Sequence, residues 1–252
     1  MQNERYVRES YGVDPLRAEI GNVRWLALLS ITGIVLMLVG LRMLPEEATP
    51  LSLKVMGLLT GSITAGAFGA YAGRNLQGWG AAIGLLIASI VGMFIVMMMA
   101  GTALGPPLLL GWGFLVGMSL GPLVSTAMEA EGYGVIMQAF TGTSAIMVLT
   151  GLYVTLTGAD FRFIGKYYFI GVLGLLLVGL VGCFIGFSRK VNLLYSLAGI
   201  GIFSIGLLYK FSMLARSENT WEAATRSAIS LYLSFVNIFA YLLQFLLLHR
   251  RR

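Results

Sequence analysis

The chain has 252 residues, of which 58% are hydrophobic and 11% are charged, and its mean hydropathy is +0.85. Because soluble domains carry about 25% charged residues, this composition excludes an ordinary soluble protein. The net charge of +6 does not indicate a nucleic-acid-binding protein, because no basic stripe with interleaved aromatic residues occurs in the sequence.

Apolar runs long enough to cross a bilayer make up most of the sequence. A membrane-spanning helix needs about 20 apolar residues to cross a hydrocarbon core of about 30 Å. By this criterion we expect eight spans: Trp25–Leu44, Leu53–Gly73, Trp79–Gly101, Pro107–Met128, Gly132–Thr157, Phe163–Ser188, Asn192–Ala215 and Trp221–Leu248. The runs are too long and too uniformly apolar for the strands of a transmembrane barrel. The sequence therefore predicts an all-α polytopic transmembrane helix bundle of about eight helices.

The spans imply one helical membrane domain at residues 25–248, preceded by a polar segment at 1–24 and followed by a basic tail at 249–252. With the N-terminus inside, the inner segments hold ten Lys and Arg residues and the outer segments hold six. Because cytoplasmic loops carry an excess of Lys and Arg, this count predicts that both termini face the cytoplasm. Basic residues at the ends of spans are also expected to contact lipid headgroups of the bilayer.

Small residues recur every four positions in two of the expected spans, a spacing that allows helix backbones to approach closely. The glycines that define the pattern are Gly57, Gly61, Gly69 and Gly73 in the second span, and Gly113, Gly117 and Gly121 in the fourth. Ordinary packing within the chain is the simpler interpretation of this pattern, and a dimer interface or a pore-lining face is the alternative. Trp25, Trp79, Trp112 and Trp221 lie near the ends of expected spans, as in an aromatic belt.

The sequence contains no recognisable catalytic, metal or cofactor site. Its single histidine, His249, lies in the predicted tail, which leaves no Ser–His pair and no histidine proton relay within the spans. No HExxH, GxSxG or phosphate-binding glycine loop is present either. We therefore expect neither an enzyme nor a cofactor-binding protein.

Charge inside the expected spans is scarce. None of the eleven Asp and Glu residues lies well inside a span, and Lys210 is the one charged residue that does. Ionisable groups inside a bilayer are costly and usually mark ion or proton pathways. The absence of carboxylates argues against a pathway for cations.

Two C-terminal stretches carry a family resemblance: Ile205–Lys210 (Ile-Gly-Leu-Leu-Tyr-Lys) and Ala228–Phe239 (Ala-Ile-Ser-Leu-Tyr-Leu-Ser-Phe-Val-Asn-Ile-Phe). With these the chain resembles the Bax inhibitor-1 family of transmembrane BAX inhibitor motif proteins, which includes bacterial YccA-like members. The resemblance covers roughly residues 108–248. It implies the family's seven-helix core plus one extra helix, in a bacterial inner membrane.

The resemblance also implies a site. Two family aspartates, which form a proton-sensitive pair that gates a calcium leak, correspond to Lys210 and Ser234 here, with Tyr209, Tyr232 and Asn237 as supporting motif residues. A lysine and a serine do not share a proton as two carboxylates do, and a fixed positive charge repels Ca²⁺.

The sequence does not determine the direction of the Lys210 side chain. Its stem is long enough to snorkel to the membrane interface. Alternatively, it faces the bundle core and bonds Ser234 or Tyr232, or it holds an anion or a carboxylate of a partner.

The preferred functional interpretation is a non-catalytic structural or regulatory subunit that binds other integral membrane proteins, such as a membrane protease. The rival is a cation leak channel with an altered, pH-insensitive gate, in which Glu129 and Glu131 line the pore mouth.

Overall fold

A computed structural model describes residues 49–76 and 79–250 of the chain. The helices are α3 (Leu51–Gly73), α4 (Trp79–Met99), α5 (Gly105–Glu131), α6 (Tyr133–Thr157), the short 3-10 helix η2 (Arg162–Ile164), α7 (Gly165–Ile185), α8 (Arg189–Leu214) and α9 (Trp221–Arg250). No strand occurs among the described residues, so the predicted all-α bundle is confirmed. Six helices are long and apolar enough to cross a membrane, and α4 adds a shorter apolar segment, Gly84–Met99. The predicted span Trp25–Leu44 lies outside the described residues.

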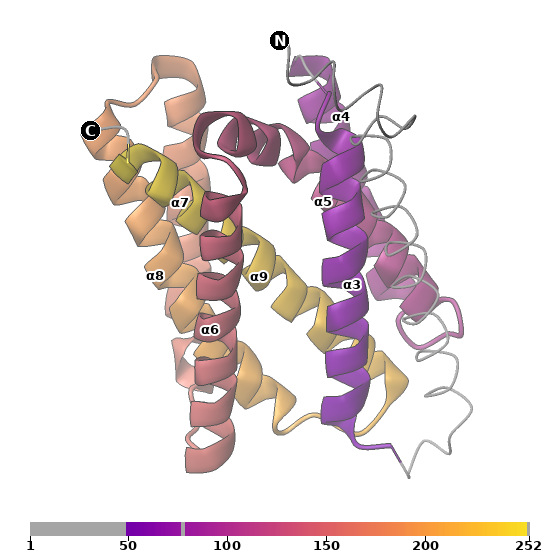
Figure 1. Ribbon diagram of the computed structural model, residues 1–252. Helices are drawn as coiled ribbons and strands as arrows, with labels where there is room; N and C mark the ends of the chain where they lie inside the picture. Colours follow the sequence, from indigo (N-terminus) through magenta and orange to yellow (C-terminus); the bar gives the residue numbers. More distant parts are fainter. Residues whose placement is uncertain (1–48, 77–78, 251–252) are drawn as a thin grey trace, which may run out of the picture.

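The last helix organises the bundle. α9 crosses it diagonally and packs against α3, α5, α6 and α8 (Figure 1). Short connections reverse the chain between successive helices. One end of the bundle therefore carries the α6–α7 connection with Asp160, and the other carries the end of α9 with Arg250. We call these the Asp160 end and the Arg250 end.

The closest helix contact joins α3 and α5, which run side by side in the same direction. A Cβ atom added at Gly117 would overlap the backbone of Gly66, and one added at Gly121 would overlap the backbone of Gly73. Backbones approach this closely only where side chains are absent. Gly69 and Gly113 belong to the same contact, whereas Gly57 and Gly61 are buried nearer the start of α3. Glycines of the pattern therefore pack α3 against α5 of the same chain. Gly66 also belongs to this contact, although the four-residue spacing did not single it out.

Aromatic side chains that rest on glycines connect α7, α8 and α9. The Tyr168 ring of α7 lies against Gly206 of α8, and the Tyr241 ring of α9 lies against Gly199 of α8. Ring contacts continue through Phe203, whose centroid lies 6.1 Å from that of Tyr168 and 6.0 Å from that of Tyr241. This packing fixes where the side chains at the end of α8 point.

Two expectations about exposed groups need correction. Trp112 is not part of an aromatic belt: it is 3% exposed, and its indole N–H donates to the Ser89 carbonyl at 2.8 Å. The predicted tail begins too early, because His249 and Arg250 belong to α9. Trp112 is thus held by a partner inside the bundle, whereas Arg250 is held at the end of the bundle by Glu131 and Gln138.

Candidate functional site

Lys210 lies near the end of α8, and its half-buried side chain points toward α9. Its Nζ donates to Ser234 Oγ at 2.6 Å and to the Ser230 carbonyl at 2.8 Å. The same nitrogen lies 5.1 Å from the centroid of the Tyr168 ring. We call these four residues the Lys210 site. The Lys210 side chain therefore faces α9 and the core of the bundle rather than snorkelling to the membrane interface.

An ammonium group has three N–H donors and no acceptor. Here two donors meet neutral oxygens, and a ring face with its negative quadrupole lies beside the charge. No ion pair to Lys210 forms within the part of the chain that the structure describes. The positive charge is therefore held without a carboxylate, and it cross-links α8 to α9.

The motif residues of α9 point in different directions, because successive helical positions turn by about 100°. Ser234 is fully buried and faces α8. Tyr232, two residues earlier, faces α5, where its hydroxyl donates to the Gly113 carbonyl at 2.8 Å and its ring packs edge-on against Trp112. Asn237 Nδ2 donates to the Leu233 carbonyl one turn back. The structure therefore brings Lys210 and Ser234 together and places Tyr232 at a separate contact.

Tyr209 stands beside Lys210 in the chain but does not join its hydrogen bonds. Its ring packs against Gly165 at the start of α7, with its centroid 6.3 Å from that of Tyr168. Tyr209 thereby supports Tyr168, the residue whose ring lies beside the Lys210 ammonium.

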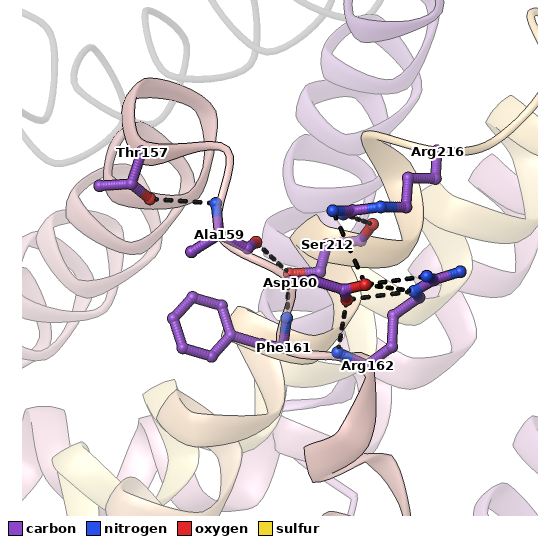
Figure 2. A network of polar contacts seen from close by, with 7 residues as sticks. All are labelled: Thr157, Ala159, Asp160, Phe161, Arg162, Ser212 and Arg216. Atoms are coloured by element: carbon purple, nitrogen blue, oxygen red, sulfur yellow. Dashed lines mark hydrogen bonds and ion pairs between the residues drawn. The ribbon is translucent and has the colours of Figure 1, made fainter.

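A polar network lies at the Asp160 end of the bundle, where the α6–α7 connection meets the end of α8 (Figure 2). The buried Ser212 hydroxyl, two residues after Lys210, accepts from the Phe161 amide at 3.1 Å and donates to the Ala159 carbonyl at 3.3 Å. Arg216 donates to the Ser212 carbonyl at 3.2 Å and approaches Asp160 at 3.7 Å. These contacts fasten the α6–α7 connection to the end of α8.

Asp160 is the acidic centre of this network. The Arg162 side chain bonds its carboxylate at 2.8 Å and the Arg162 amide bonds it at 3.0 Å, and these bonds lower the pKa of Asp160 from 3.8 to about 2. Because the folded-state pKa is depressed, its stabilising effect is present above pH 3.8 and is lost as the pH falls toward 2.

We expect Asp160→Asn to lower the melting temperature of the detergent-solubilised protein slightly at neutral pH, and we expect this difference to shrink as the pH falls toward 2. The reason is that the wild-type carboxylate itself becomes protonated in that range. Thermal unfolding of both proteins across this pH series tests the expectation. Glu222→Gln, which removes the exposed pair with Arg226, is the matched control. A melting difference that stays constant down to pH 2 would contradict the role of Asp160.

Lys54, one of the six Lys and Arg residues counted in the outer segments, is a buried cation in the structure. It is 0% exposed, and its Nζ donates to Asn219 Oδ1 at 3.1 Å and lies 5.4 Å from the centroid of the Trp221 ring. The signal that could have identified it is its place inside the predicted span Leu53–Gly73. Lys54 ties the start of α3 to the α8–α9 connection.

An ionic contact at the Arg250 end involves Glu131, one of the two carboxylates considered as pore-mouth residues. Arg250 lies 3.6 Å from Glu131 and donates to Gln138 at 2.7 Å, so the end of α9 is fastened to α5 and α6. Glu129 is exposed and forms no ion pair within the described residues. No group of three or more His, Cys, Asp or Glu residues in the described part of the chain is placed to hold a metal ion.

Ser234 and Lys210 are expected to respond differently to substitution. Ser234→Ala removes an acceptor and leaves a charged N–H unsatisfied, which costs about 1–3 kcal/mol of unfolding free energy. Lys210→Met removes the charge itself and keeps the packed stem, so it is expected to be neutral or stabilising. Chemical or thermal unfolding of both single variants and the double variant tests this order. Equal losses in the two single variants would contradict it.

These features define a class: a polytopic helical membrane protein in which a lysine, bonded to neutral oxygens, joins the last two helices. Residues 48–251 match the family described as "Inhibitor of apoptosis-promoting Bax1", and the chain belongs to that family. This agrees with the resemblance seen in the C-terminal motifs.

The chain is similar to several bacterial proteins. An uncharacterized protein of Campylobacter jejuni is 32% identical over 140 residues, which cover 55% of this chain and 59% of the relative. A Helicobacter pylori protein is 28% identical over 130 residues, 52% of this chain and 55% of the relative. The "Modulator of FtsH protease YccA" of Escherichia coli K12 is 29% identical over 165 residues, 64% of this chain and 74% of the relative. The chain thus spans less than two thirds of the length of the first two relatives.

Proposed function

We propose that this chain is a non-catalytic regulatory protein of the membrane that binds another integral membrane protein, with a membrane-bound protease as the first candidate. The Lys210 site is the observation that carries the proposal. An ammonium held between α8 and α9 by neutral oxygens joins the two helices and opposes the passage of cations. What remains available for function is the surface of the bundle and its polar ends.

The relative YccA supports the choice of partner class, since its name describes a modulator of the FtsH protease. The polar segment 1–24 and the basic C-terminus are the proposed cytoplasmic contact points. The first lies outside the described residues. Within the second, Arg250 is already engaged by Glu131 and Gln138, and Arg251 and Arg252 lie outside the described residues.

Copurification in a gentle detergent tests the proposal. The full-length protein is expressed in its own host and isolated, and bound protease is measured by mass spectrometry and by degradation of a model membrane substrate. We expect a membrane protease in a fixed ratio, an altered degradation rate, and retention of both with Lys210→Met. A protein that purifies alone and conducts Ca²⁺ in liposomes would support the rival channel instead.

Topology is a separate expectation. We propose an inner-membrane protein with the Arg250 end and both termini in the cytoplasm, from the ten-to-six distribution of Lys and Arg. Reporter fusions after Arg252 and at Arg189–Lys190, where α8 begins, are both expected to report the cytoplasm. A fusion after Asp160 is the control on the opposite side. Disagreement between the first two fusions would contradict the arrangement of α8 and α9 as consecutive spans.

A further inference from the structure

A cleft opens on the side of the bundle between α4 and α9, with α5 as its floor. Its volume is about 860 Å³, within the range of about 300–1,000 Å³ that is typical of ligand pockets. Leu86, Ile90 and Met93 of α4 line one wall, and Leu233 and Val236 of α9 line the other. We call it the lateral cleft.

Most polar groups along the lateral cleft are already bonded within the protein. The Trp112 indole N–H donates to the Ser89 carbonyl at 2.8 Å, and the Ser119 hydroxyl donates to the Val116 carbonyl at 2.6 Å. Asn237 Nδ2 donates to the Leu233 carbonyl at 2.7 Å. The surface offered to an occupant is therefore largely hydrocarbon, which suits an acyl chain better than a polar ligand.

The length of the cleft matches one leaflet of the bilayer. It extends along α4 from Ala81 near the Arg250 end to Met93. The helix rises about 18 Å between these two residues, at about 1.5 Å per residue. Half of a hydrocarbon core of about 30 Å is about 15 Å. An acyl chain that enters from the headgroup region at the Arg250 end therefore reaches the deep end of the cleft near the midplane.

A cation, Arg74, lies close in the chain to the end of the cleft that faces the Arg250 end. Arg74 is exposed at the end of α3, two residues before Leu76, which lines the cleft. A Cβ added at Gly121 would lie 2.7 Å from the Arg74 amide nitrogen, and the next residue, Pro122, lines the cleft. Arg74 stacks 4.0 Å from the centroid of the Tyr71 ring and forms no ion pair within the described residues. Its guanidinium is therefore available to a phosphate.

From these observations we propose that the lateral cleft binds a phospholipid of the leaflet at the Arg250 end. One acyl chain lies between α4 and α9, and the phosphate bonds Arg74. This site does not depend on the proposed protease partner, since its occupant is supplied by the membrane itself.

Fluorescence quenching tests the acyl-chain half of the proposal. Trp112, 3% exposed, lines the deep part of the cleft, and a variant with Trp25→Phe, Trp79→Phe and Trp221→Phe leaves it as the single reporter. The variant is reconstituted in phosphatidylethanolamine–phosphatidylglycerol vesicles whose acyl chains carry bromine either near the methyl end or near the headgroup. We expect stronger quenching by bromine near the methyl end. Ala240→Phe narrows the cleft and is expected to reduce that quenching by roughly half or more.

Leu176→Phe is the matched control, because Leu176 is 60% exposed on α7, away from the cleft. It is expected to leave quenching unchanged. Equal quenching at both bromine depths, or quenching that Ala240→Phe does not alter, would overturn the proposal. So would a change of oligomeric state with Ala240→Phe and no change in quenching, because the cleft would then receive a helix of a second copy.

The phospholipid that copurifies with the wild-type protein, which keeps all four tryptophans, gives a second, independent measurement. Native mass spectrometry of the wild-type protein is expected to show a bound phospholipid, with phosphatidylglycerol favoured over phosphatidylcholine after exchange. Arg74→Gln is expected to lower that preference several-fold while leaving quenching of Trp112 in place. Retention of no phospholipid by the wild type, or an unchanged preference in Arg74→Gln, would contradict the headgroup contact.

Discussion

Reconstituted alone in liposomes, the wild-type protein is expected to release little or no Ca²⁺. No carboxylate lies in the interior of a described helix, and the Lys210 ammonium stands in the core, where repulsion of a divalent cation is poorly screened. The same absence of acidic groups predicts that the residual leak changes little between about pH 5 and 8. Ca²⁺-dye fluorescence at several pH values measures both quantities.

Replacing both Lys210 and Ser234 by aspartate is expected to produce a Ca²⁺ leak that the wild type lacks. The 2.6 Å contact between Lys210 Nζ and Ser234 Oγ shows that side chains at these positions meet. Lys210→Asp with Ser234→Asp therefore places two carboxylates close enough to share a proton, and the pair titrates in coupled steps. We expect the double variant to leak Ca²⁺ at a rate that depends on pH, and neither single variant to do so fully.

Lys210→Met is the matched control, since it removes the charge without supplying an acid. It is expected to leak no more than the wild type, because its stem still fills the space between α8 and α9. A robust Ca²⁺ flux through the wild-type protein that is insensitive to substitution at Lys210 would remove the regulatory interpretation and support the channel.

The existence and type of the helices were predictable because membrane spans carry a strong local signal. A run of about 20 apolar residues has few alternatives to a helix in hydrocarbon, where backbone groups must bond within the segment. The seven predicted spans from Leu53–Gly73 to Trp221–Leu248 accordingly differ from α3–α9 by only a few residues at their ends. The main discrepancies, such as the extension of α9 to Arg250, reflect contacts between helices.

The direction of the Lys210 side chain was not predictable, because its stem reaches either the interface or the core. Packing around it decides the outcome. Gly206 of α8 admits the Tyr168 ring of α7, which brings that ring beside the ammonium, and Ser234 of α9 supplies an acceptor. These contacts join residues far apart in the sequence, and no local pattern encodes them.

The burial of Trp112 and Lys54 was also not predictable from the sequence. Each lies near the end of a span, where aromatic and basic residues usually meet lipid headgroups. The structure instead buries them against Tyr232 and Trp221, respectively. Both partners belong to α9. Because α9 crosses the bundle diagonally, it covers Trp112 and Lys54, which the sequence alone would place at the membrane interface.

The largest loss of stability is expected from Gly117→Ala at the contact between α3 and α5. The new methyl group would overlap backbone atoms of Gly66, and backbone atoms, unlike the end of a flexible side chain, do not move aside cheaply. Overpacking costs about 1–3 kcal/mol and occasionally more, and we expect the upper end of this range here. Thermal unfolding in detergent and resistance to dodecyl sulfate measure the loss.

Gly111→Ala, six residues earlier on the same helix, is the matched control. A Cβ there meets no other atom within 4 Å, and alanine favours a helix over glycine by about 1 kcal/mol. The two substitutions are chemically identical and are therefore expected to change stability in opposite directions. If Gly117→Ala matched the control, α3 and α5 would not approach through Gly66 and Gly117. That result would favour the alternatives for the glycine pattern, a dimer interface or a pore-lining face.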